Sequence, residues 1–162
     1  MTAHRQTASG TFTLALPPHE AFRLFTPIGE RDWAPGWDPR FTAATTDDSA
    51  PGTVFVTDAH RQTAIWVVVD REQGRSIRYA RVLPGSTAGT VTVVLQDDAG
   101  HSAVTVTYDL TALTDDAAHD LHHFIEGFPA FLESWRQAIG RASGHQVVGG
   151  AQHRVGDQRR GV

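Results

Sequence analysis

The chain has 162 residues, of which 40% are hydrophobic and 20% are charged, as is typical of a globular domain and not of a disordered chain. The 14 basic residues, all of them Arg, stand against 18 Asp and Glu residues, and the resulting charge of −4 predicts no affinity for nucleic acid or for an anionic membrane. Because Cys and Lys are absent, disulfides, thiolate nucleophiles, Cys-ligated metal sites and lysine Schiff bases are excluded.

Three regions can be predicted along the chain. Residues 1–9 are polar, lack the apolar run of a signal peptide, and are expected to be flexible. Residues 10–142 are expected to form one domain, and residues 143–162, which are Gly-rich, polar and aperiodic, a disordered tail. No segment is long and apolar enough to cross a bilayer. These features predict a cytoplasmic protein with no membrane partner.

The first predicted element is a strand over residues 11–16, where Thr or Ala alternates with apolar residues. Its apolar face contains Phe12, Leu14 and Leu16. Two prolines end this strand, and the apolar spacing of residues 19–25 then predicts a short helix. Residues 26–39 are too rich in Pro and Gly for a continuous element and predict a broken helix and loop.

Residues 41–111 predict successive strands joined by turns. Turn signals lie at residues 47–52, 70–74, 84–85 and 97–100. Because consecutive strands joined by short turns pair with one another, this segment predicts an antiparallel meander. The last strand has the clearest alternation, with an inner face made of Val104, Val106, Tyr108 and Leu110.

A long amphipathic helix is predicted at the C-terminal end of the domain. Thr114 followed by Asp115 and Asp116 is typical of an N-cap with acidic residues in the first turn. At about 100° per residue, one stripe contains Leu121, Phe124, Ile125, Phe128, Leu132, Trp135 and Ile139. Pro129 lies inside this helix and predicts a kink near residues 126–127.

This order of elements resembles the START/Bet v1-like helix-grip superfamily, also called SRPBCC, and its polyketide cyclase/dehydrase-like bacterial members. The most specific local similarity lies in residues 24–31 and 33–39, and further similar segments are residues 65–68, 77–85 and 106–113. The resemblance covers about residues 10–142. It implies an α+β fold in which a curved antiparallel sheet wraps around a long C-terminal α-helix, with two short N-terminal helices.

The resemblance also implies a cavity between the sheet and the C-terminal helix, lined mainly by apolar and aromatic side chains. The candidate ligand-binding residues are Trp33, Trp37, Trp66, Tyr79, Tyr108, Phe124 and Phe128. Each of them can instead fill the core, but several Trp and Tyr residues together favour a partly polar cavity. The alternation of the fourth predicted strand leaves open whether Ile65 or Trp66 faces inward.

Arg81 is a further candidate ligand-binding residue. The more bulky face of its strand, made of Ile77, Tyr79, Arg81 and Leu83, is expected to point inward. A guanidinium in a cavity needs a carboxylate, a carbonyl or an anionic ligand to offset its desolvation. The alternatives are a solvated side-chain end or a structural ion pair.

Candidate catalytic groups are Glu30, Arg81 and Tyr108. Glu30 lies beside Trp33 in the chain, and a carboxyl group near a Trp in a pocket mouth can have a raised pKa and act as an acid or base. The alternative for Glu30 is a helix cap or a local brace. No nucleophile elbow, P-loop or dinucleotide fingerprint occurs in the sequence, and no cofactor is expected.

The helical histidines have the spacing of metal ligands but not the expected orientation. His119 and His123, and likewise His122 and Glu126, are four residues apart, as are two ligands on one helix face. Both pairs lie opposite the apolar stripe and therefore face solvent. No functional metal is expected.

Three functions remain open at this point. The first is a carrier or sequestering protein for a small hydrophobic or aromatic molecule. The second is an enzyme similar to polyketide cyclases and dehydratases that acts in the same cavity. The third is a protein-interaction module similar to Hsp90 activators, which needs an exposed apolar patch instead of a cavity. The sequence is compatible with a monomer or a homodimer.

Overall fold

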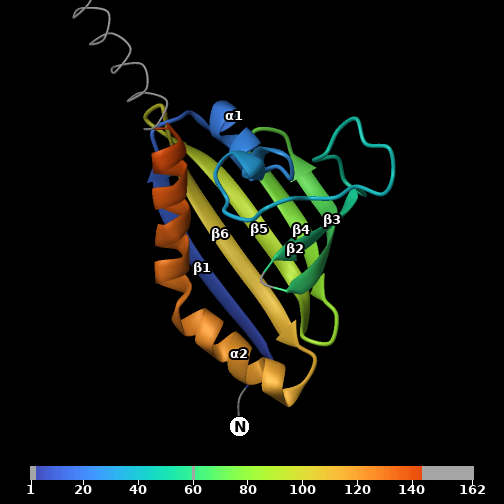
Figure 1. Cartoon of the computed structure of the whole chain (residues 1–162). Coiled ribbons are helices and arrows are strands. Elements are labelled where there is room, and N and C mark those ends of the chain that lie inside the picture. Colours follow the sequence, from blue (N-terminus) through green and yellow to red (C-terminus); the bar gives the residue numbers. More distant parts are fainter. Residues whose placement is uncertain (1–2, 60, 144–162) are drawn as a thin grey trace, which may run out of the picture.

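The computed structural model describes residues 3–59 and 61–143, so that the predicted tail lies, apart from its first residue, outside the described residues. Six strands form one antiparallel sheet (Figure 1): β1 Arg5–Leu14, β2 Val54–Ala59, β3 Gln62–Glu72, β4 Ser76–Leu83, β5 Thr87–Asp98 and β6 His101–Ala112. The helical segments are α1 Pro18–Ala21, the 3₁₀ turns η1 Phe22–Phe25 and η2 Gly29–Asp32, α2 Asp115–Glu126, and a helix over residues 128–143.

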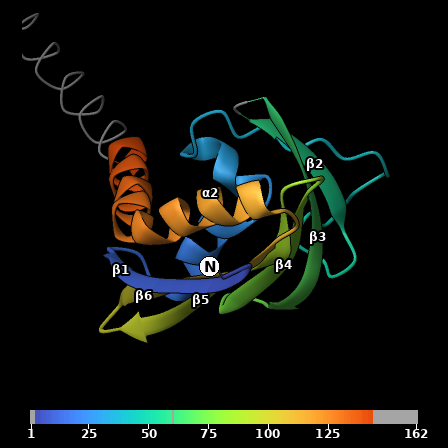
Figure 2. The same ribbon diagram turned by 90° about the horizontal axis from the view of Figure 1, so that it is seen from below.

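The sheet has the strand order β1-β6-β5-β4-β3-β2, in which β2 to β6 form the predicted meander. β1 forms one edge of the sheet and pairs with β6, with Phe12 opposite Val104. Figure 2 shows that the sheet curves around α2 and the short N-terminal helices. The predicted helix-grip fold is therefore confirmed.

The C-terminal helix is interrupted where the sequence predicts its kink. α2 begins after Thr114, whose hydroxyl accepts a hydrogen bond from the Ala117 amide at 3.1 Å, and it ends at Glu126. Gly127 is not helical, and a new helix starts at residue 128. A Cβ atom at Gly10 on β1 would lie 2.5 Å from the Leu132 Cδ1 atom, so the glycine leaves room for this side chain of the second helix. None of the helices in the described ranges is long and apolar enough to cross a membrane.

The sheet includes residues that the sequence interpretation places elsewhere. β1 starts at Arg5, so that residues 5–9 belong to the sheet and not to a flexible N-terminus. The reason is that polar side chains on the outer face of β1 pair with polar side chains of β6, and a search for alternating apolar residues does not detect such pairs. These pairs are Ser9 with Thr107 and Thr11 with Thr105, each at 2.9 Å, and Arg5 with Asp109 at 2.8 Å.

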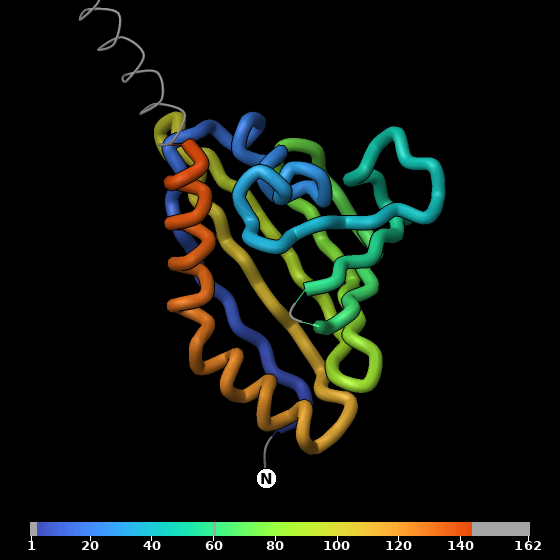
Figure 3. Tube along the Cα trace, in the orientation of Figure 1, coloured from blue at the N-terminus to red at the C-terminus, as the bar shows by residue number. Residues whose placement is uncertain are grey.

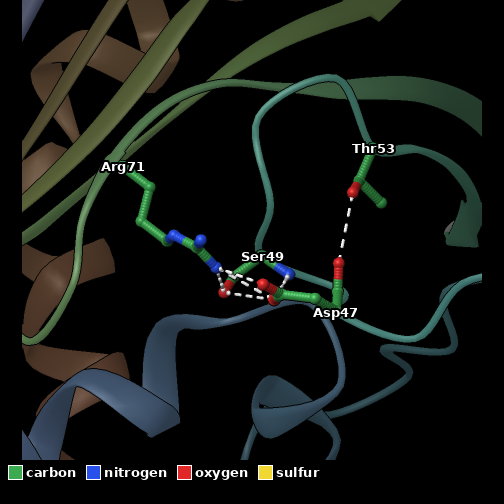
Figure 4. Close-up of polar contacts among 4 residues, drawn as sticks. All are labelled: Asp47, Ser49, Thr53 and Arg71. Atoms are coloured by element: carbon green, nitrogen blue, oxygen red, sulfur yellow. Dashed lines mark hydrogen bonds and ion pairs between the residues drawn. The ribbon is translucent and has the colours of Figure 1, made fainter.

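Residues 41–53 form a loop, and the strand that the sequence predicts before residue 47 is absent from this described segment. The loop projects from the body of the domain (Figure 3) and is held by its acidic residues. The Arg71 guanidinium on β3 donates to both Asp47 carboxylate oxygens at 2.9 and 2.8 Å and to the Ser49 hydroxyl at 2.9 Å (Figure 4). The Asp48 carboxylate accepts from the Ile28 amide at 2.8 Å, which ties the loop to the segment before η2.

Candidate functional site, an aromatic cavity with free polar groups

A cavity of about 230 Å³ lies between the concave face of the sheet, the segment around η2 and the helix over residues 128–143. Seven of the candidate residues line it: Glu30, Trp33, Trp37, Trp66, Tyr79, Arg81 and Tyr108. Because they come from β3, β4, β6 and the N-terminal segment, only the folded sheet brings them together. We call this space the aromatic chamber.

The structure also shows which face of β3 points into the cavity. Trp66 is 7% exposed and lines the aromatic chamber, whereas Ile65 is 37% exposed on the outer face. The neighbouring inward positions are Ala64 and Val68, both buried. The ring of Trp66 is therefore part of the cavity wall, beside its cross-strand partner Arg81.

Two predicted residues lie outside this chamber, and two aromatic residues that were not predicted line it. Phe124 lines a neighbouring cavity, and Phe128 is buried with its ring centroid 5.6 Å from that of Tyr108, so it belongs to the core. Phe131 and Trp135 line the aromatic chamber. The signal for Phe131 was present, because it follows Phe124 by seven residues and precedes Trp135 by four, the spacing of one helix face.

Glu30 reaches the chamber because the chain around η2 is folded very tightly. The Thr26 hydroxyl donates to the Arg23 carbonyl at 2.8 Å and accepts from the Gly29 amide at 3.1 Å. A Cβ atom at Gly29 would lie 1.7 Å from the Arg23 carbonyl oxygen, so only glycine fits there. The turn that this glycine permits places Glu30, 8% exposed, in the cavity wall.

Most aromatic donors in the wall are satisfied by protein groups. The donor atoms and their acceptors are Trp33 Nε1 to the Leu24 carbonyl at 2.7 Å, Trp37 Nε1 to the Pro27 carbonyl at 2.7 Å, Tyr79 Oη to the Phe25 carbonyl at 2.6 Å and Trp66 Nε1 to Thr57 Oγ1 at 3.0 Å. Three of these four acceptors are backbone carbonyls of the N-terminal segment. These side chains therefore hold the cavity wall together and have no donor left for a ligand.

Glu30, Arg81 and Tyr108 behave differently. None of the hydrogen bonds or ion pairs between described residues involves their carboxyl, guanidinium or phenol groups. The polar atoms of these groups stay accessible from the cavity, since no fully buried polar side-chain atom in the described residues lacks a partner. The Arg81 guanidinium lies 5.6 Å from the centroid of the Trp66 ring, a cation–π contact that leaves its N–H groups free. The aromatic chamber thus contains one cation, one phenol and one carboxyl group without protein partners.

Burial changes the proton affinity of all three groups. It raises the pKa of Glu30 well above 4.5, which favours the protonated carboxyl. It also raises the pKa of Tyr108, with the Arg81 charge opposing this shift, so Tyr108 is a neutral donor. Burial lowers the pKa of Arg81, but a guanidinium stays charged in proteins.

The curved sheet, the terminal helix and the cavity define a protein of the helix-grip class. Residues 5–139 match the family described as polyketide cyclase / dehydrase and lipid transport, and the chain belongs to that family. No sequence among the curated proteins matches the chain.

Solved structures show the same fold at low sequence identity. Protein MLL2253 from Mesorhizobium loti is 18% identical with a TM-score of 0.63, over 84% of this chain and 98% of that one. Ara h 8.0201 is 14% identical with a TM-score of 0.61, over 86% and 99%. The Zhui aromatase/cyclase from Streptomyces sp. R1128 is 16% identical with a TM-score of 0.59, over 86% and 94%. At these identities the likeness concerns the fold alone.

The two cavity tyrosines are expected to respond differently to loss of their hydroxyl groups. Tyr79→Phe leaves the buried Phe25 carbonyl without its donor and should lower the free energy of unfolding by about 1 to 3 kcal/mol. Tyr108→Phe removes a hydroxyl that bonds to no described residue, and should change it by less than about 0.5 kcal/mol. Urea unfolding of both variants measures the difference. Equal destabilisation would show that Tyr108 has a structural partner.

Glu30 should make stability fall as the pH rises. In the folded state burial keeps Glu30 protonated, whereas in the unfolded state it ionises near 4.5, so unfolding releases a proton between these two pKa values. Wild-type stability should therefore decline through this window more than that of Glu30→Gln. Melting temperatures from about pH 5 to about pH 8 test this. Glu20→Gln, at an exposed position, is the control and should follow the wild type; parallel curves for Glu30→Gln would contradict the prediction.

Proposed function

We propose that the protein binds a small aromatic molecule in the aromatic chamber, with a carboxylate, enolate or carbonyl oxygen of that molecule on the Arg81 guanidinium. The observation that carries this proposal is the inward-facing guanidinium of Arg81, which has no acceptor among the residues that the structure describes. Arg81 is half-buried, and a ligand that displaces its remaining water must supply an acceptor, since removing an ion from water otherwise costs several kcal/mol. An oxygen of the ligand supplies that partner.

The chamber walls favour an aromatic ring. All four tryptophans of the chain and both tyrosines line the chamber, and Phe131 adds a further ring. Aromatic rings pack well against one another at offset and edge-to-face geometries, as Trp37 and Trp66 already do at 5.4 Å. A flat unsaturated ligand can extend this packing.

The volume limits the size of the ligand. An apolar cavity of about 150 Å³ holds benzene, or roughly 25 Å³ for each non-hydrogen atom. At that ratio, the 230 Å³ of the aromatic chamber accommodates about nine non-hydrogen atoms. This suits a single substituted ring. Tyr108 and Glu30 then offer hydrogen bonds to hydroxyl or carbonyl groups of the ring substituents.

Removing the charge at Arg81 should weaken the binding of anionic ligands selectively. Cinnamate and its neutral analogue N-methylcinnamamide are suitable probes, because the phenyl and vinyl carbons that they share fit the chamber and their carbonyl group would lie on Arg81. Arg81→Met keeps an unbranched stem and deletes the charge, so it should raise the Kd of cinnamate by at least about tenfold and that of the amide by a smaller factor. Isothermal titration calorimetry measures both. Tryptophan fluorescence gives a second readout, because every tryptophan lines the chamber.

Arg78→Met is the matched control for this experiment. Arg78 lies on the same strand but faces outward, where its guanidinium donates to the Thr92 hydroxyl at 3.3 Å. This variant should bind both probes as the wild type does. The proposal fails if the wild type binds neither probe, or if Arg81→Met and Arg78→Met have the same effect.

A second candidate function is enzymatic, and the free carboxyl of Glu30 favours it. A carboxyl with a raised pKa is a stronger base when ionised, and Arg81 in the same chamber can stabilise an enolate oxygen. These groups suit loss of water from a β-hydroxy carbonyl compound. Glu30 would remove the α-proton, the C–O bond to the β-hydroxyl would break as the C=C bond forms, and the same proton would leave with the hydroxyl as water.

The dehydration of 4-hydroxy-4-phenylbutan-2-one tests the enzymatic function. Its product is a conjugated enone whose absorbance can be followed directly. Wild-type protein should accelerate product formation, Glu30→Gln should abolish the acceleration, and Glu20→Gln should retain it. The same rate for wild type and Glu30→Gln would leave ligand binding as the function.

The third hypothesis, a protein-interaction module, requires exposed apolar side chains, and some lie on the outer face of the sheet. Val54 and Val69 are each 45% exposed there, and Ile65 is 37% exposed. These side chains lie on neighbouring strands, β2 and β3. They form the kind of surface that this hypothesis requires, but the free polar groups of the aromatic chamber have no role in it. Ligand binding accounts for them and is therefore preferred.

A further inference from the structure

A second cavity, of about 160 Å³, lies next to the aromatic chamber under α2. Its walls come from α2, β6 and the turn between β4 and β5, and include Ala117, Leu121 and Phe124 on the helix and Ser86 in the turn. We call it the helix chamber. Arg81, Leu83 and Gln62 line both chambers. The two spaces are therefore adjacent, with these side chains as their shared wall, and Arg81 lies at the boundary between them.

We propose that the two chambers form one elongated binding site for a molecule with an aryl group, a central carbonyl and a short neutral chain. The aryl group would occupy the aromatic chamber, the carbonyl oxygen would accept hydrogen bonds from Arg81, and the chain would lie in the helix chamber. This inference rests on the proposed function, since it takes ligand binding in the aromatic chamber as its starting point. It adds the second chamber and the part of the ligand that fills it.

The position of Arg81 determines which part of the ligand carries the oxygen. A guanidinium at the closed end of a pocket would select a terminal carboxylate. Arg81 instead lines both chambers, so a group that binds it has space on either side. A ketone, ester or amide carbonyl meets this requirement because it continues in two directions, whereas a carboxylate ends the molecule.

The chemistry of the helix chamber favours an uncharged chain. Leu110, Leu121 and Phe124 contribute apolar walls, and the carboxylate in the wall belongs to Asp120. Asp120 disfavours an anionic chain end, because like charges repel. At roughly 25 Å³ per non-hydrogen atom, the 160 Å³ of this chamber holds about six such atoms. A chain the length of a butyl group fits this volume.

Two amides of cinnamic acid test the inference. N-methylcinnamamide ends near Arg81, whereas N-butylcinnamamide extends past it by three further methylene groups. The wild type should bind the butyl amide at least about tenfold more tightly, because each buried methylene adds to binding. Ala117→Leu and Ser86→Leu each fill the helix chamber from a different element. Both should remove this advantage while leaving the Kd of N-methylcinnamamide within about twofold of wild type.

Ala130→Leu is the matched control, since it makes the same substitution at an exposed position of the terminal helix that lines neither chamber. It should keep the advantage of the butyl amide. The inference is overturned if the wild type binds both amides equally, or if the advantage persists in both chamber-filling variants. If the wild type binds neither amide nor cinnamate, the proposed function itself fails. If urea unfolding shows that Ala117→Leu does not fold, the Kd values of Ser86→Leu alone test the inference.

Discussion

The attachment of residues 22–37 to the sheet is the constraint on which the site depends. This segment contains two short 3₁₀ turns, whose ends leave backbone carbonyls that the backbone of the turns does not satisfy. Aromatic side chains supply partners for three of them: the Tyr79 hydroxyl on β4 donates to Phe25 at 2.6 Å and joins the segment to the sheet, while the Trp33 and Trp37 indoles donate to Leu24 and Pro27 at 2.7 Å and brace the segment internally. These bonds fix the segment over the concave face and keep Glu30 in the wall.

The cavity wall therefore contains two kinds of polar side chain. Those that bond to the protein stabilise the fold, and their loss should lower stability. Glu30, Arg81 and Tyr108 bond to no described protein group, and because no fully buried polar side-chain atom in the described residues lacks a partner, their polar atoms stay accessible from the cavity. Binding sites commonly retain such groups, because a partner supplied by the ligand confers affinity and specificity. Substitutions of the bonded groups should therefore change stability, and substitutions of the free groups should change ligand binding.

Much of the fold could be predicted because its signals are local. Period-two alternation marked β6 and the inward face of β4, and the cap at Thr114 and the break at Gly127 followed from residue types. Two errors occurred where tertiary contacts override local pattern. Polar cross-strand pairs extend β1 back to Arg5. Residues 41–53 form a loop that the ion pair of Asp47 with Arg71 fixes in place, although the sequence predicts a strand before residue 47.

The sequence by itself determined the class of fold, the inward direction of Arg81 and Tyr108, and the aromatic nature of the cavity, because each follows from periodicity along one element. Only the tertiary structure decided which polar atoms are free. A hydrogen bond such as that from Tyr79 to Phe25 joins residues 54 positions apart, and no spacing rule encodes it. The same reason applies to the boundary position of Arg81, since two chambers share a wall only after the sheet and helix have packed.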